Sequence, residues 1–223
     1  IGHVTLQYPI GTEGDVACTG VTAILPHGGN LFKEKVSAAC YVLNGFGKTT
    51  GMVQVEELGV IESPIMLTNT FAVPTITHGT LTYMLAQNKE IGDTTGTINI
   101  VVGECNDSKL NSIRTLPVTP EHAIQAIEGA TEQKVTEGAV GAGTGMTCFG
   151  YKGGIGSSSR IIVQENGQYT VGCLVLSNFG TKEEFQWGKY SLQANTNNSE
   201  RPNDGSIIIV LATDAPLSSR QLK

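Results

Sequence analysis

Near its end the chain reads Asn203-Asp204-Gly205-Ser206 and then Ile207-Ile208-Ile209-Val210-Leu211-Ala212-Thr213-Asp214. The second part is a run of β-branched and aliphatic residues, which predicts a buried strand over 207–212. Ser206 at the start of such a strand is held rigidly, and Gly205 has access to backbone angles that other residues avoid. A hydroxyl in this position can attack the carbonyl before it, which splits the chain and leaves Ser206 as a new amino-terminal nucleophile. The simpler alternative is a turn that enters a strand.

Strand-like runs separated by turn residues dominate the rest of the chain. We expect further strands at 3–8, 21–25, 36–43, 51–56, 64–68, 97–102, 146–150, 160–164 and 169–176. Helices are expected at 75–88, from Thr119 to Gly129, and from Asp214 onward with Asp214 as its cap. The asparagine-rich stretch 193–205 is expected to be a long exposed loop. Many strands with few helices predict an α/β protein in which sheets pack together and helices lie outside.

Composition narrows the class of protein. The 223 residues suffice for one large domain or at most two. Only 15% of them are charged and the net charge is −6, so neither a nucleic acid nor an anionic membrane surface is an expected partner. The longest apolar runs have the length of strands, far short of a membrane span.

The cysteines indicate a reducing compartment. They are odd in number, scattered, and without a CxxC pair, so we expect reduced core thiols in a cytoplasmic protein, with one disulfide as the alternative. The five are Cys18, Cys40, Cys105, Cys148 and Cys173.

Two glycine-rich stretches each lack a residue that a cofactor loop requires. A phosphate loop ending in Gly47-Lys48-Thr49 needs glycine at position 42, where Val42 stands. A dinucleotide fingerprint over 141–146 needs glycine where Met146 stands. The histidines lack the paired spacing of metal ligands; they are His3, His27, His78 and His122. No cofactor and no metal are expected.

Two polar residues stand where apolar runs end. Asn178 follows the run Val171–Leu176, so its amide either serves a turn or projects into a cleft, where it can donate to an oxyanion. Glu104 follows the strand expected at 97–102. It is either a solvated loop acid or a carboxylate that holds the ammonium group of a substrate, as an aminopeptidase requires.

Seven sequence blocks, spread along almost the whole chain, carry a resemblance to a known family and follow one another in the same order as in that family. They are Thr19-Gly20-Val21-Thr22-Ala23-Ile24-Leu25-Pro26, Val55-Glu56-Glu57, Pro64-Ile65-Met66-Leu67-Thr68-Asn69-Thr70, Glu137-Gly138-Ala139-Val140-Gly141-Ala142-Gly143-Thr144-Gly145-Met146, Lys152-Gly153-Gly154-Ile155-Gly156-Ser157-Ser158-Ser159-Arg160, Gly205-Ser206-Ile207-Ile208-Ile209-Val210 and Ala212-Thr213-Asp214-Ala215-Pro216-Leu217. Together they resemble the family of L-aminopeptidase/D-esterases, self-processing serine hydrolases that include the β-peptidyl aminopeptidases.

The resemblance implies a four-layer α/β/β/α sandwich with mixed sheets, similar to the amino-terminal-nucleophile hydrolases. It also implies a precursor that cuts itself between Gly205 and Ser206. Residues 1–223 would then form a single domain, incomplete at both ends, with 1–205 as the α-chain part and 206–223 as the start of the β-chain part. By position, Ser206 is the nucleophile, Asn178 stabilises the oxyanion, and Glu104 holds the substrate's amino group.

The same resemblance implies an aminopeptidase that acts on short peptides, amides or esters and forms homo-oligomers. The serine and glutamate partners that the family carries further along have no counterpart here, which implies a missing C-terminal segment or a companion chain. Asn106 stands where relatives tend to have tyrosine, and Phe71 where they often have histidine. The alternatives are an acyltransferase of the ornithine acetyltransferase type, which typically cuts before threonine, and a truncated non-catalytic homologue.

Overall fold

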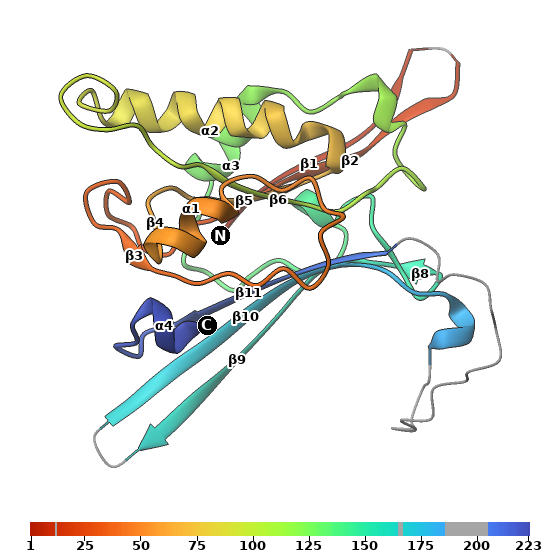
Figure 1. Cartoon of the computed structure of the whole chain (residues 1–223). Coiled ribbons are helices and arrows are strands. Elements are labelled where there is room, and N and C mark those ends of the chain that lie inside the picture. The colour runs from red at the N-terminus through yellow and green to blue at the C-terminus, as the bar shows by residue number, and fades with distance from the viewer. Residues whose placement is uncertain (12, 165–166, 186–204) are drawn as a thin grey trace.

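A computed structural model describes residues 1–11, 13–164, 167–185 and 205–223. Its layers are stacked as helices, a first sheet and a second sheet (Figure 1). The expected mixed α/β architecture of packed sheets is confirmed, and three of the four expected layers lie in the described part of the chain. The exposed loop predicted over 193–205 lies outside the described residues except for Gly205.

The first sheet has the strand order β1-β2-β5-β6. Its strands are β1 (Gly2–Ile10), β2 (Asp15–Ile24), β5 (Ile65–Thr68) and β6 (Val101–Glu104), and only the pair β5–β6 is parallel. Helices α2 (Val73–Gln87) and α3 (Pro120–Glu128) cover its outer face. Both helices were expected, and Val21, Met66 and Ile76 are among the residues that form the core between them and the sheet.

The second sheet is antiparallel, with the strand order β11-β10-β9. Its strands are β9 (Gly154–Gln164), β10 (Gly167–Asn178) and β11 (Ser206–Thr213). Alternation along β11 turns Ile208 and Val210 toward a core between the two sheets, whereas Ile209 is 56% exposed on the other face. The strand predicted at 207–212 is therefore confirmed, but in the described residues only one of its faces is buried.

A close approach of the two sheets sets the position of β11. A Cβ atom added at Gly103 of β6 would lie 2.8 Å from Cδ1 of Ile208 and 3.2 Å from Cδ2 of Leu67. Because no side chain occupies position 103, Ile208 of β11 fits directly against β6. The start of β11 and the end of β6 are consequently neighbours in the fold, although they are far apart in the sequence.

The remaining elements are short. They are β3 (Val36–Ser37), α1 (Met52–Leu58), β4 (Val60–Ile61), β7 (Thr147–Cys148), β8 (Tyr151–Lys152), α4 (Ser219–Leu222) and the 3₁₀ turns η1 (Thr70–Ala72), η2 (Ile113–Thr115), η3 (Gly141–Gly143) and η4 (Lys182–Glu184). Strand β3 pairs with β4, and β7 pairs with β8.

The strand predicted at 51–56 is wrong, because α1 occupies this segment. The alternation of Val53 and Val55 resembles a strand, but Val55 is buried while Val53 is 86% exposed. Gly51 and Gly59 flank the helix with φ angles of 87° and 67°, and the N–H of Gly59 donates to the carbonyl of Val55. Two glycines with left-handed angles therefore decide the outcome.

Several further strands are shorter than predicted, among them β7, which covers only Thr147–Cys148 of the expected 146–150. Strand β3 ends at Ser37, and Tyr41 is 81% exposed in what was expected to be its continuation. Strand β6 begins only at Val101. The preceding Asn99 donates its backbone N–H to Oε1 of Glu62 at 2.7 Å instead of to a neighbouring strand.

Asp214 does not cap the last helix, contrary to expectation. Its Oδ1 accepts a hydrogen bond from the N–H of Thr170 at 2.6 Å. Helix α4 begins at Ser219, where Ser218 and Gln221 form a capping box.

All five cysteines are free thiols, and only Cys105 is fully buried. The expectation of core thiols is thus correct for one and too strong for the four half-buried ones. Across the described ranges, no helix has both the length and the apolar character that crossing a membrane requires.

Candidate active site

Ser206 is the first residue of β11, and Asn178 is the last residue of β10. The antiparallel register pairs these two residues directly. Nδ2 of Asn178 donates to Oγ of Ser206 at 3.2 Å. Two sequence-predicted residues are therefore brought together where the paired strands end and begin.

Two further contacts fix the Asn178 amide. Its Oδ1 accepts from the N–H of Thr147 at 3.1 Å, and its Nδ2 donates to the carbonyl of Asn106 at 2.7 Å. Because a backbone N–H can only donate and a carbonyl can only accept, these partners determine which end of the amide faces Ser206. Asn178 thus presents an N–H group to the hydroxyl, as an oxyanion donor must.

Gly205 is needed for space rather than for its backbone angles. Its φ lies outside the left-handed region, contrary to the reason given by the sequence. An added Cβ would lie 2.7 Å from Cβ and 3.0 Å from Cα of Phe179. Phe179 is itself held edge-on against Phe149, with ring centroids 5.0 Å apart. A side chain at position 205 would therefore displace the backbone that leads into Ser206.

Glu104 ends β6 and is only 7% exposed, which excludes a solvated loop acid. Its Oε1 accepts from the N–H of Lys48 at 2.9 Å, and its Oε2 accepts from the hydroxyl of Thr70. A carboxylate has about four acceptor positions, so both oxygens retain capacity for a cationic partner.

Residues 104–106 connect the two parts of the site. Glu104 is followed by Cys105, whose thiol donates to the carbonyl of Leu176 and lies beside the Ser206 side chain, and then by Asn106, whose carbonyl holds Asn178. Burial raises the pKa of Cys105 to about 12, so this thiol is neutral near pH 7 and is a poor nucleophile. Sequence reasoning missed Cys105, Thr70 and the backbone groups of 48, 106 and 147.

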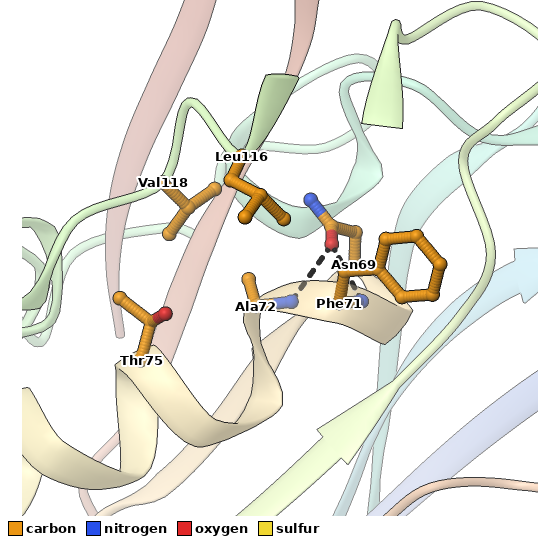
Figure 2. Close-up of a pocket in the computed structure, with 6 residues that line it drawn as sticks. All are labelled: Asn69, Phe71, Ala72, Thr75, Leu116 and Val118. Carbon is orange, nitrogen blue, oxygen red and sulfur yellow. Dashed lines mark hydrogen bonds between the residues drawn. The ribbon is translucent and has the colours of Figure 1, made fainter. Parts of the chain in front are cut away.

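A pocket near the start of α2 is separate from this cluster. Figure 2 shows the Asn69 side chain turned toward the backbone N–H groups of Phe71 and Ala72. Its Oδ1 accepts a hydrogen bond from each of them at 3.0 Å. The pocket is lined by Asn69, Phe71, Ala72, Thr75, Leu116 and Val118. The pocket shares the Asn69-Thr70 turn with the site, because the threonine of this turn donates to Glu104.

A buried polar cluster supports the segment that holds Asn178. Asp107 follows Asn106 and is 1% exposed. Its Oδ1 accepts from Nδ2 of Asn111 at 3.0 Å, and the side chains of Thr19 and Asn69 lie beside it. Burial outweighs these hydrogen bonds and raises the pKa of Asp107 to about 6 from its ordinary value of 3.8.

This pKa predicts a pH-dependent stability. Between pH 4 and 6 the folded chain retains a proton on Asp107 that the unfolded chain has released, so the stability that this group contributes at low pH is lost as the pH rises through about 6. In Asp107→Asn this contribution is absent. From pH 4 to pH 7, the free energy of unfolding of the wild type, measured with urea, should therefore fall relative to that of Asp107→Asn by roughly 3 kcal/mol.

Asp93→Asn, at an exposed position, is the matched control and should show no such change. A difference between Asp107→Asn and wild type that stays constant over this pH range would contradict the prediction.

The sequence profile of peptidase family S58 matches residues 1–223. A β-peptidyl aminopeptidase, BapA of Sphingosinicella microcystinivorans, is 42% identical over 223 aligned residues, covering 92% of this chain and 55% of the relative. The chain thus spans about half the length of this curated relative.

Solved structures agree. The PH0078 protein of Pyrococcus horikoshii OT3 has a TM-score of 0.87 and 48% sequence identity. The aligned part covers 99% of this chain and 62% of the PH0078 chain. The L-aminopeptidase D-Ala-esterase/amidase of Ochrobactrum anthropi, described as a prototype serine aminopeptidase and a variant of the Ntn-hydrolase fold, has a TM-score of 0.79 and 29% identity at the same coverage. The expected fold and family are confirmed: this chain belongs to peptidase family S58.

Proposed function

We propose that the protein is a self-processing serine aminopeptidase that releases amino-terminal residues from short peptides, amides or esters. The observation that carries the proposal is the contact of 3.2 Å between Oγ of Ser206 and Nδ2 of Asn178, at the first residue of β11. The names of the relatives, which are a β-peptidyl aminopeptidase and an L-aminopeptidase D-Ala-esterase/amidase, support it.

Self-cleavage is the first step. Oγ of Ser206 loses its proton and forms an ester with the carbonyl carbon of Gly205, while the peptide C–N bond breaks and the Ser206 nitrogen takes up a proton. Water then hydrolyses the ester, which leaves a carboxylate on Gly205 and a free α-amine on Ser206. Residues 1–205 thereby become the α-chain part, and 206–223 begin the β-chain part.

Hydrolysis of a substrate repeats this chemistry. The α-amine of Ser206, with a reference pKa of roughly 7.7–8.0, accepts the proton of its own hydroxyl as Oγ attacks the carbonyl carbon. Nδ2 of Asn178 donates to the oxyanion, the leaving group departs with a proton, and water hydrolyses the acyl-enzyme. Glu104 holds the ammonium of the substrate's first residue and so positions its carbonyl.

The test is intact mass spectrometry of the whole protein, followed by amino-terminal sequencing. We expect two products, one ending in Gly205 and one beginning Ser206-Ile207-Ile208, together with hydrolysis of aminoacyl p-nitroanilides. An uncut protein that hydrolyses no such compound would favour a non-catalytic homologue instead. A cut protein that transfers acetyl groups to glutamate would favour the acyltransferase.

Glu104→Gln should separate substrate binding from the chemistry at Ser206. The amide keeps the shape of the carboxylate and can still accept from Lys48, but it loses the charge that pairs with an ammonium. Because a charge-assisted hydrogen bond contributes about 1.5–3 kcal/mol, KM for aminoacyl p-nitroanilides should rise on the order of tenfold to a hundredfold.

Self-cleavage of Glu104→Gln should keep the wild-type rate, because no substrate ammonium takes part in it. Glu128→Gln, at an exposed position of α3, is the control for loss of a negative charge. An unchanged KM in Glu104→Gln would remove Glu104 from the binding site.

The proposal also includes a partner for the exposed face of β11, the oligomeric state and the cellular location. A further C-terminal segment or a companion chain would cover the outer face of β11, where Ile209 and Leu211 are 56% and 68% exposed. Homo-oligomers are proposed from the family resemblance. A cytoplasmic location is supported by the five free thiols.

A further inference from the structure

Lys152 is a charged residue to which the proposed function gives no part. It lies in β8, at the start of the block Lys152-Gly153-Gly154-Ile155-Gly156. Its ammonium donates to three backbone carbonyls, those of Gly143 at 2.9 Å, Met146 at 2.8 Å and Gly153 at 2.9 Å. An ammonium has three N–H donors, so each of them has a protein partner.

One of these carbonyls leads directly to the site. The carbonyl of Met146 and the N–H of Thr147 belong to the same peptide group. That N–H donates to Oδ1 of Asn178 at 3.1 Å, and Nδ2 of Asn178 donates to Oγ of Ser206 at 3.2 Å. A continuous series of hydrogen bonds therefore runs from the Lys152 ammonium through two planar amide groups to the proposed nucleophile.

The direction of every bond in this series is the same. A cation at a carbonyl oxygen draws electron density through the amide and makes its N–H a stronger donor. The Met146–Thr147 peptide group is thereby polarised toward Oδ1 of Asn178, and the Asn178 amide is polarised in turn toward Ser206. A negative charge that develops beside Ser206 during attack is stabilised by this arrangement.

The glycine after Lys152 holds the same peptide group from another side. The N–H of Gly153 also donates to the carbonyl of Met146, at 2.9 Å. A Cβ added at Gly153 would lie 2.9 Å from the carbonyl carbon of Thr147 and 3.1 Å from the nitrogen of Cys148. Only a glycine allows this approach. Lys152 and Gly153 together therefore hold, by hydrogen bonds and close packing, the segment that orients Asn178.

We propose that Lys152 is a positioning residue for the oxyanion donor: it fixes and polarises the Met146–Thr147 peptide group, which orients the Asn178 amide and strengthens its donation at Ser206. This inference rests on the proposed function of Ser206 and Asn178. Lys152 as a whole residue is exposed, but partial burial of its ammonium, which donates to the three carbonyls, lowers its pKa.

The test is a double-mutant cycle in the whole protein, with Lys152→Met, Asn178→Ala and the combination of the two. The readouts are the rate of self-cleavage, from intact mass, and kcat and KM for an aminoacyl p-nitroanilide. Loss of a complete oxyanion donor costs about a hundredfold to a thousandfold in kcat, so a donor that is only weakened should cost about tenfold. We expect this loss in Lys152→Met with KM unchanged, and no further loss when Lys152→Met is added to Asn178→Ala.

Two further variants keep the result interpretable. Lys182→Met removes a neighbouring exposed lysine, whose Nζ lies 5.3 Å from the centre of the Tyr151 ring, and should leave both rates unchanged. Lys152→Gln retains a donor without the charge, and carries the test if Lys152→Met does not fold. Thermal unfolding of each variant reports folding independently of activity.

The outcomes separate this inference from the proposed function. If Ser206→Ala still cuts itself and hydrolyses the substrate, the proposed function fails. If Ser206→Ala is inactive but Lys152→Met is fully active, the inference alone fails. Losses that add in full, or a failure of both Lys152 variants to fold, would make Lys152 a structural residue and would also overturn the inference.

Discussion

Ser206→Ala is expected to abolish both self-cleavage and hydrolysis. The methyl group cannot form the ester with Gly205 or the acyl-enzyme with a substrate, and loss of a nucleophile of this kind costs on the order of a millionfold in kcat. The protein should remain folded, because Ser206 is half-buried and the inward side chains of β11, such as Ile208, are untouched. Intact mass should show one uncut product, and aminoacyl p-nitroanilides should remain intact.

The matched control is Ser159→Ala. Ser159 is an exposed serine of β9 in the same sheet, so this change removes a hydroxyl without touching the site. It should be cut and active like the wild type. Cleavage of Ser206→Ala between the same two residues would show that another group attacks the Gly205 carbonyl, and would remove Ser206 from the mechanism.

The sequence predicted the strands of the site well because their patterns are strong. The aliphatic runs before Asn178 and after Ser206 are typical of strands, and β10 and β11 form where strands were expected. The ends of these strands carry the two residues, so the position of each followed from the strand. Their direct pairing did not, because register depends on which strands become neighbours.

The remainder of the site depends on backbone groups and on burial, which leave no signature in the sequence. The N–H of Thr147 and the carbonyl of Asn106 fix the Asn178 amide, yet any residue at those positions except proline at 147 would supply them. Glu104 could be assigned to a cleft or to solvent until the fold showed that it is only 7% exposed. Gly205 was predicted for the wrong reason, since only the fold reveals its contact with Phe179.

The Lys152-Gly153 pair illustrates the same limit. Its block was distinctive in the sequence, but the partners of the ammonium are carbonyls from three separate positions. Only the folded backbone brings these carbonyls to one point. Side-chain chemistry on strands is thus predictable from the sequence, whereas the backbone that orients it has to be observed.

Asn178→Asp replaces the proposed oxyanion donor by a side chain of nearly equal size and should be strongly damaging. It removes the N–H groups that Asn178 donates to Oγ of Ser206 and to the carbonyl of Asn106. It also places a negatively charged oxygen beside that carbonyl, where the present donor lies at 2.7 Å, and beside the position where the oxyanion forms. Both effects oppose the transition state, so kcat and the rate of self-cleavage should fall by at least about a hundredfold to a thousandfold.

The comparison with Asn178→Ala separates the two effects. Alanine removes the donor without adding charge, so it should retain more activity than aspartate. Asn44→Asp is the matched control, because Asn44 is exposed and its Oδ1 accepts from the N–H of Phe46, a role that aspartate can keep. The rates are measured by intact mass over time and by release of p-nitroaniline. Equal rates in Asn178→Asp and wild type would mean that the oxyanion is stabilised by other groups, and that the contact between Asn178 and Ser206 serves only to hold the two strand ends together.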